Sequence, residues 1–307
     1  MGVWIDTDMG FDDLAAIMVA AHGGLAIDGI SLVFGNAPLE QVRRNASGAA
    51  AAFVWPFPIH AGRAKPVLGK LETAVSILSD AGMPTAGEAL PAGPDAFAED
   101  AFEALCAWLE RGEGERRVLA LGPLTNIAAV ALARPDLAAK ITDLTWMGGG
   151  LTAGNHTASA EFNAFADPEA VAIVLADEIP FRMVDLDLCR KVLCAPEDVD
   201  PVRAAGGRNA LLLADLLAGF VAIATSRGRK AMSLYDAVAA VAFVQPDLVT
   251  WGEARIDMEL AGAVTRGRTV VETRSGRGEF NARFAADIDA QRAKDIILSA
   301  LKAEASW

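Results

Sequence analysis

The chain has few residues from which a disulfide framework or a zinc site could be built. Its cysteines, Cys106, Cys189 and Cys194, are odd in number and form no CxxC pair. This pattern favours neither a disulfide-bonded scaffold nor a zinc ribbon. We interpret all three as buried free thiols of a protein that resides in a reducing compartment.

Positive charge is also scarce. The chain has 27 Lys and Arg against 40 Asp and Glu, which gives a net charge of −13 and an isoelectric point near 4.7. Nucleic acids and anionic membranes would be repelled, so neither is expected as a partner. A small neutral or metal-associated substrate fits better. No basic leader and no apolar run of membrane-spanning length is visible, so we expect a soluble, cytoplasmic protein.

What the chain does have is apolar residues, at 53% of its 307 positions. This is enough to bury a large core in one domain or two, and composition alone does not decide between them. No internal repeat or low-complexity tract divides the sequence, and no segment reads as a linker. We therefore expect a single domain over residues 1–307.

The most informative stretch lies near the N terminus, where four aspartates fall within eight residues. An apolar run short enough for a buried strand precedes them, and apolar residues at helical spacing follow. Asp6 and Asp8 would point to one side at the strand end, while Asp12 and Asp13 would begin the helix. Four like charges this close need a cation to offset their repulsion. Oxygen ligands without His or Cys favour Ca²⁺ or Mg²⁺ over zinc, and Ca²⁺ if backbone carbonyls contribute.

A simpler interpretation of the same stretch is local. Asp12 would cap the helix, Asp13 would favour its dipole, and the other two aspartates would be solvated turn residues. Capping accounts for one or two acidic residues at a helix start. It does not account for Asp6 and Asp8, whereas a metal site accounts for all four.

Strand-like and helix-like patterns alternate along the rest of the chain. Further strands are predicted at 30–34, 116–121, 144–147 and 181–186, and Asp167 with Pro168 would open a helix. Residues 255–260 and 269–273 alternate like a hairpin, and 290–302 reads as a closing helix. The sequence predicts an α/β protein with an open, mostly parallel, Rossmann-like sheet and helices on both faces. Its ligand should lie at the carboxyl ends of the strands.

Polar side chains follow several of the predicted strands. Amides and carboxylates of this kind suit the hydroxyl groups of a polyol, because they offer hydrogen-bond acceptors and donors without requiring a charged substrate. For any one of them, hydrogen bonding within its own loop is the competing interpretation. The residues concerned are Asn36, Thr125, Asn126, Asn155, Glu161 and Asn163.

These motifs together resemble the inosine–uridine-preferring nucleoside hydrolases. Residues 6–13 look like the DxDxGxDD signature of that family, and the likeness extends over about residues 3 to 245. Other matching stretches occur in the family's order and spacing. They are Phe34-Gly35-Asn36, Gly122-Pro123-Leu124-Thr125-Asn126, Met147-Gly148-Gly149, Gly154-Asn155, Glu161-Phe162-Asn163 and Asp167-Pro168-Glu169-Ala170.

The resemblance implies a site, position by position. A Ca²⁺ ion would be held by two aspartates of the first motif, a backbone carbonyl and a late aspartate, namely Asp8, Asp13, Leu121 and Asp236. The 2′- and 3′-hydroxyls of a ribose would complete the metal shell close to Asp12 and Asn36. The 5′ side of the ribose would meet Asn155, Glu161 and Asn163.

The activity implied is Ca²⁺-dependent hydrolysis of the N-glycosidic bond of a ribonucleoside, which yields free base and ribose. A water held by the metal would give its proton to Asp8, a general-base role typically worth about 10²–10⁴-fold. Members of the family are dimers or tetramers, so a homodimer or homotetramer is expected.

The chain departs from the family in the group that would protonate the leaving base. Many members place one His directly before the late aspartate and a second His in an earlier loop. This chain has Tyr235, its only tyrosine, at the first position, and its corresponding loop, residues 80–84, contains no His. A phenol is protonated at neutral pH and could donate to the base, or it could stack on the base. His156 in the site loop is another candidate, whereas His22 and His60 are interpreted as structural.

Two other functions fit parts of the pattern. Haloacid-dehalogenase-type phosphatases also open with Asp-x-Asp after a strand, but their motif wants Thr or Val where this chain has Gly10, and it leaves Asp12 and Asp13 unexplained. A non-catalytic relative could keep the calcium and ribose site and lack the acid. Ribose release separates the hydrolase from the binding protein, and phosphate release would identify the phosphatase.

Overall fold

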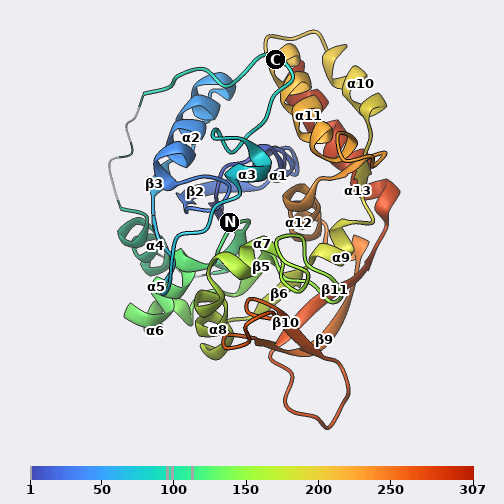
Figure 1. The fold of residues 1–307 in the computed structure, drawn as a ribbon. Helices are drawn as coiled ribbons and strands as arrows, with labels where there is room; N and C mark the ends of the chain where they lie inside the picture. The colour runs from blue at the N-terminus through green and yellow to red at the C-terminus, as the bar shows by residue number, and fades with distance from the viewer. Residues whose placement is uncertain (1, 95–96, 98–99, 112–113) are drawn as a thin grey trace.

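The computed structural model describes residues 2–94, 97, 100–111 and 114–307 (Figure 1). Its centre is a nine-stranded sheet in the order β10-β9-β11-β6-β5-β4-β1-β2-β3. The strands are β1 (Gly2–Thr7), β2 (Ala26–Leu32), β3 (Ile59–Ala61), β4 (Arg117–Ala120), β5 (Asp143–Met147), β6 (Phe181–Val184), β9 (Val249–Met258), β10 (Thr269–Glu272) and β11 (Ala282–Ile288). A separate ribbon pairs β7 (Leu193–Cys194) with β8 (Met232–Ser233).

The seven strands that lie side by side from β11 through β6, β5, β4, β1 and β2 to β3 run parallel. Strand β9 runs antiparallel to both β11 and β10. The predicted α/β class with a mostly parallel sheet is therefore confirmed, and so is the hairpin near the C terminus. The helices are α1 (Phe11–His22), α2 (Leu39–Phe53), α3 (Val75–Leu78), α4 (Ala101–Glu110), α5 (Thr125–Ala133), α6 (Pro135–Ala138), α7 (Phe162–Ala166), α8 (Pro168–Ala176), α9 (Leu186–Cys189), α10 (Val199–Arg203), α11 (Ala210–Thr225), α12 (Tyr235–Val244) and α13 (Ala290–Ala305). Two 3₁₀ turns cover Pro196–Asp198 and Pro246–Leu248.

The helices cover both faces of the sheet, as Figure 1 shows. Alternate side chains of a strand point to opposite faces, so Ile5 joins one core cluster and Trp4 the other. The larger cluster packs the sheet against α1, α2, α11, α12 and α13, and the other packs it against α4, α5, α6 and α8. With both faces buried, the strands read as nearly continuous apolar runs.

Several predicted boundaries differ from the structure. The strand predicted at 30–34 spans Ala26–Leu32. It ends before Val33 and Phe34, whose amides bond to the carbonyls of Thr7 and Arg63. The strand predicted at 181–186 ends at Val184, because Asp185 caps α9 by accepting a hydrogen bond of 2.7 Å from the amide of Leu188. Two strands were not predicted, namely β3, which has three residues, and β11, which carries charges at the exposed positions Arg283 and Asp287.

The helix predicted after Asp167 is confirmed. The Oδ1 atom of Asp167 accepts a hydrogen bond from the amide of Ala170, at 3.1 Å, and so caps α8. The longest helices, α11 and α13, have 16 residues each. Among the described residues, no helix combines the length and the apolar character needed to cross a membrane.

The parallel order places the carboxyl ends of β1, β4, β5 and β6 at one edge of the sheet. The residues that follow these strands therefore meet there, although they are far apart in the sequence. This is the edge at which ligands bind in open α/β sheets.

Candidate active site

A cavity of about 290 Å³ opens at this edge of the sheet. Of the residues assigned above to the metal, the ribose or the leaving base, all but Asp13 line it, and Asp13 lies fully buried behind the wall. The lining residues from that set are Asp8, Asp12, Asn36, Leu121, Asn155, His156, Glu161, Asn163, Tyr235 and Asp236. The other predicted polar residues, Asp6, Thr125 and Asn126, do not line it, because Nδ2 of Asn126 donates to Oδ1 of Asp6 at 2.7 Å and the hydroxyl of Thr125 donates to Oδ2 of Asp167 at 2.7 Å. The fold thus brings together side chains from the β1–α1 turn, the 155–163 segment and the start of α12.

The β1–α1 turn fixes the position of Asp13. The amide of Gly10 donates to Oδ2 of Asp13 at 2.8 Å, and the hydroxyl of Thr7 donates to Oδ1. Met9 has a positive φ of 50° at the tip of the turn. A Cβ atom on Gly10 would lie 2.4 Å from Nδ2 of Asn36, so only glycine lets the Asn36 side chain approach the turn.

Asp8 is held by the loop after β2. Its Oδ2 accepts a hydrogen bond of 2.7 Å from the amide of Asn36, and its Oδ1 accepts one of 2.8 Å from Nδ2 of the same residue. Asn36 Nδ2 also lies 3.2 Å from Oδ2 of Asp13. One asparagine therefore orients two of the carboxylates and leaves its own side-chain oxygen available to a ligand.

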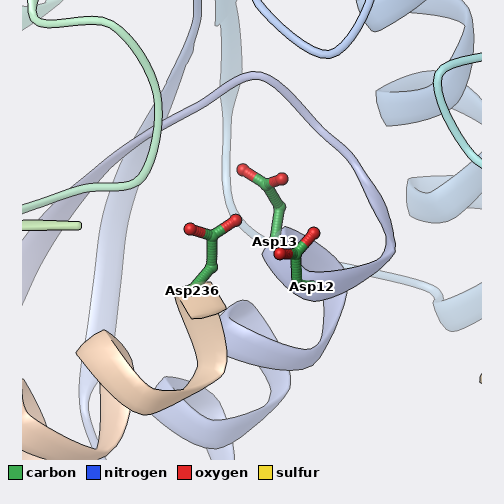
Figure 2. Close-up of side chains that lie close together, drawn as sticks. All are labelled: Asp12, Asp13 and Asp236. Atoms are coloured by element: carbon green, nitrogen blue, oxygen red, sulfur yellow. The ribbon is translucent and has the colours of Figure 1, made fainter. Parts of the chain in front are cut away.

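Three carboxylates converge where α1 and α12 begin. Asp12, Asp13 and Asp236 each offer one oxygen, and these oxygens lie within 4.8 Å of one another. Figure 2 shows all three carboxylates pointing into the same space, two from α1 and one from α12. Both helices present their N-terminal ends to this point, which favours negative charge there. Among the described residues, no Lys or Arg donates a hydrogen bond to these carboxylates or to Asp8.

The carboxylates are buried and repel one another. Burial, together with the negative charge of Asp13, raises the pKa of Asp12 to about 8. Burial also raises the pKa values of Asp8, Asp13 and Asp236, and neighbouring carboxylates add to the effect at Asp8 and Asp236. The cluster must therefore be neutralised by protons or by a cation. An all-oxygen set of this kind suits a hard divalent ion, so the residues present fit the metal that the sequence predicts.

The three converging carboxylates are not the three that the resemblance implies as metal ligands. The converging set contains Asp12, whereas the implied set contains Asp8 in its place. The remaining implied ligand, the carbonyl of Leu121, lines the cavity and accepts a hydrogen bond of 2.8 Å from Nδ2 of Asn163. A carbonyl oxygen has two lone pairs, so this bond leaves one for a cation.

Glu161 and Asn163 join the strand ends to α7. The carboxylate of Glu161 caps α7 and accepts hydrogen bonds from the amides of Gly149, Asn163 and Ala164 at 2.9–3.1 Å. Burial raises its pKa to about 7 against the lowering effect of these bonds. The Asn163 amide donates to the carbonyls of Leu121 and Met147, so only its oxygen is left to face a ligand.

The loop that carries Asn155 and His156 is exposed. Oδ1 of Asn155 accepts a hydrogen bond of 2.9 Å from the amide of Phe162, which ties the loop to α7. The His156 ring lies 4.5 Å from the ring of Phe165, between centroids, and its partial burial lowers the pKa of the imidazole. His156 is therefore neutral at pH 7.

Tyr235 is the first residue of α12 and lies half-buried in the cavity wall beside Asp236. Burial raises the pKa of its phenol, and the charge of Asp12 raises it further. The hydroxyl therefore stays protonated at neutral pH and can donate. His22 lies 3.4 Å from Glu304 and His60 stacks on Trp4, and neither lines the cavity.

The sequence analysis missed two groups in the cavity wall. One is apolar and comes from α3, α11 and β8, and the other consists of arginines. A signal for the arginines was available, because the run from Arg227 to Lys230 is basic, in an acidic chain, and lies shortly before Asp236. The missed residues include Ile77, Leu78, Phe220, Ile223, Met232, Arg190, Arg227 and Arg229.

Three comparisons agree on the kind of protein this chain is similar to. A model of the family described as "Inosine-uridine preferring nucleoside hydrolase" matches residues 3–295. The pyrimidine-specific ribonucleoside hydrolase RihB of Escherichia coli (strain K12 / DH10B) is 30% identical over 271 residues, which are 87% of this chain and 86% of that protein.

Solved structures show the same fold. A purine-preferring ribonucleoside hydrolase from Gardnerella vaginalis superposes with a TM-score of 0.91, at 25% identity, over 100% of this chain and 99% of that one. A plant nucleoside hydrolase superposes with a TM-score of 0.90, at 23% identity, over 98% and 99%. The family match leaves the haloacid-dehalogenase-type phosphatase without support.

A buried carboxylate next to this site gives a prediction for stability. Asp185 is fully buried after β6, its Oδ2 has no hydrogen-bond partner among the described residues, and burial raises its pKa to about 6. The unfolded carboxyl ionises first, so this group makes the folded state less stable as the pH rises from about 4 to about 6. Asp185→Asn keeps the cap on α9 and removes the charge. Relative to the unmodified protein, its free energy of unfolding should rise by about 1–3 kcal/mol between pH 4 and pH 7.

Urea unfolding at both pH values measures this difference. Asp80→Asn is the matched control, because Asp80 is exposed. A difference between Asp185→Asn and the unmodified protein that does not change with pH would contradict the prediction.

Proposed function

The chain belongs to the inosine-uridine preferring nucleoside hydrolase family and is a nucleoside hydrolase, and from this premise we propose that it cleaves ribonucleosides with Ca²⁺ in the carboxylate cluster. The products are a free base and ribose. The observation that carries the proposal is the cavity itself, in which buried carboxylates, backbone carbonyls and amide oxygens face one space.

The metal would be held by the carboxylates of Asp8, Asp13 and Asp236 and by the carbonyl of Leu121, with Asp12 beside them. Ca²⁺ is favoured over Mg²⁺, because it accepts several carboxylates and a carbonyl in a flexible shell. When bound, Ca²⁺ would offset the repulsion among the aspartates and bind the vicinal hydroxyls of the ribose.

The remaining polar groups suit the rest of the sugar. The free side-chain oxygens of Asn36 and Asn163 accept hydrogen bonds from ribose hydroxyls. Asn155 and Glu161 lie on the 5′ side, and the hydrogen bonds from Gly149 and Ala164 keep Glu161 in place. A sugar bound by acceptors on several sides is oriented with its anomeric carbon toward Asp8.

Cleavage of an N-glycosidic bond passes through a ribosyl cation. A water molecule attacks C1′ while the bond from C1′ to the base nitrogen breaks, and the nitrogen keeps the bonding electrons. Asp8 accepts a proton from the attacking water, and its position is fixed for this role by two hydrogen bonds from Asn36. The surrounding carboxylates favour the positive charge that develops on the sugar.

The nucleobase departs either with a proton supplied by a donor in the site or, if it is a good leaving group, without one. Tyr235 is protonated, adjoins Asp236 and lines the cavity, so it is proposed as the donor. A substrate-assisted departure is the alternative, and neutral His156 is the other candidate in the wall. The relatives named above differ in base preference, one pyrimidine-specific and another purine-preferring.

The remaining expectations stay predictions. We propose that residues 1–307 form one domain, that the protein is a homodimer or homotetramer, and that it acts in the cytoplasm. The three cysteines are all buried and free, which agrees with a reducing compartment.

The role of Asp8 is tested by Asp8→Asn. If Asp8 is both ligand and base, this change should lower the rate of ribose release from uridine or inosine, with Ca²⁺ in excess, by at least about 10²–10⁴-fold. Circular dichroism should stay near that of the unmodified protein, and Asp80→Asn, at an exposed position, should be fully active.

Two results would count against this account of Asp8. Near-normal turnover by Asp8→Asn would remove the general-base assignment. Absence of ribose release by the unmodified, calcium-loaded protein from every nucleoside in a panel of purine and pyrimidine ribosides would refute the proposed function itself.

Tyr235→Phe tests the proton donor, because it removes the hydroxyl and keeps the ring. Loss of a general acid should slow natural nucleosides by about 10²–10⁴-fold and leave an activated substrate such as nitrophenyl riboside nearly unchanged. The inhibition constant of free ribose should also stay unchanged.

Other outcomes assign Tyr235 differently. Equal loss on both substrates would indicate that Asp236, the next residue in α12, has been displaced. No loss on either would assign Tyr235 to packing or stacking, and His156→Ala would then be the variant to measure.

A further inference from the structure

Two arginines in the cavity wall have no part in the reaction described above. Arg227 and Arg229 are exposed, lie between α11 and β8, and both line the cavity. The backbone there is fixed, because the amides of Arg227 and Arg229 both bond to the carbonyl of Ala224, at 3.0 and 3.1 Å. Their side chains therefore start from defined positions at the rim.

Neither side chain is committed to a protein partner. Over the described ranges, no acceptor receives a hydrogen bond from either guanidinium, and no carboxylate lies within ion-pair distance of it. Arg190, in the same wall, is different. It donates to the carbonyls of Ala153 and Gly154 and lies 3.8 Å from Asp187. Arg190 thus supports the site loop, whereas Arg227 and Arg229 are available to a ligand.

The surroundings of these two arginines suit the base rather than the sugar. Ile223 and Phe220 of α11 and Met232 of β8 line the same wall and offer apolar surface to a planar ring. Tyr235 connects this wall to the carboxylate cluster, because Asp236 follows it in α12.

We propose that Arg229, assisted by Arg227, contacts the departing base and stabilises the negative charge that it gains as the bond to C1′ breaks. This inference rests on the proposed function and adds a catalytic residue to it. The oxygen of water bonds to C1′, Asp8 takes one proton of that water, and the base nitrogen takes the electron pair of the broken bond. Fixed positive charge next to that nitrogen lowers the barrier and reduces the need for a histidine acid. The base takes up a proton as it departs, from Tyr235 or from solvent.

Arg229→Gln is the direct test, with Arg229→Lys as the charge-preserving variant. Lys230→Gln is the matched control, because Lys230 is exposed, neighbours Arg229 and does not line the cavity. Arg229→Gln should lower kcat for uridine by about 10–10²-fold. This loss is smaller than the loss expected on removal of a fully buried donor, because Arg229 is exposed to solvent. The same variant should lower kcat for nitrophenyl riboside by only a few fold, since that leaving group needs little stabilisation. Arg229→Lys should recover most of the loss, and the inhibition constant of ribose should not change.

A combined variant separates direct action on the base from action through Tyr235. If Arg229 contacts the base, Arg229→Gln should still lower kcat in a Tyr235→Phe background, although the two effects need not be additive because both residues act on the same base. Disappearance of the effect in that background would overturn the inference, as would equal loss on uridine and nitrophenyl riboside or activity equal to that of Lys230→Gln. These outcomes are distinct from failure of the proposed function, in which the unmodified protein itself releases no ribose.

Discussion

The main constraint on the site is the repulsion among carboxylates that are buried together where α1 and α12 begin. Asp12, Asp13 and Asp236 place oxygens within 4.8 Å of one another, and Asp8 adjoins them. Two helix N termini, the hydroxyl of Thr7 and the amide of Gly10 offset part of this repulsion. The rest must be offset by protons or by a cation, and the all-oxygen arrangement favours a divalent ion. The same ion would bind the ribose diol, so the ion that offsets the carboxylate repulsion would also bind the substrate.

The parts of the site that follow one another in the chain could be predicted from the sequence. The spacing of Asp6, Asp8, Asp12 and Asp13 indicates a strand, a turn and a helix, and the structure has that arrangement in β1 and α1. The metal stays a prediction, and Asp6 is not one of the converging carboxylates, because it bonds to Asn126 instead. The local interpretation, in which Asp12 caps the helix, is wrong in its residue, because Gly10 is the N-cap of α1 and Asp13 is the residue whose carboxylate accepts the hydrogen bond from the Gly10 amide. The parallel sheet followed from the alternation of apolar strands with helical patterns. Only the resemblance indicated that Asp236 joins the first motif, because no local pattern reports a contact between residues so far apart.

Other features depend on tertiary contacts that no sequence pattern reports. Asp12 belongs to the converging carboxylates because α1 and α12 begin side by side, and β11 lies inside the sheet although it carries Arg283 and Asp287. The side chain of Asn163 donates to the carbonyls of Leu121 and Met147, which leaves only its oxygen for the substrate contact that the resemblance implies. The wall that would face the base, with Arg227, Arg229 and the apolar side chains of α11, comes from a segment that shortly precedes Asp236 but matches none of the family motifs. The base end of the cavity is therefore where this chain differs most from what its motifs predict.

We expect the carboxylate cluster to be partly protonated without a cation and to bind one Ca²⁺ per chain. Calorimetric titration of Ca²⁺ into chelator-treated protein at pH 7, repeated in buffers with different ionisation enthalpies, tests it most directly. We predict one site per chain, release of protons on binding, and loss of the site in Asp236→Asn. Absence of binding, or binding that survives Asp236→Asn, would contradict it.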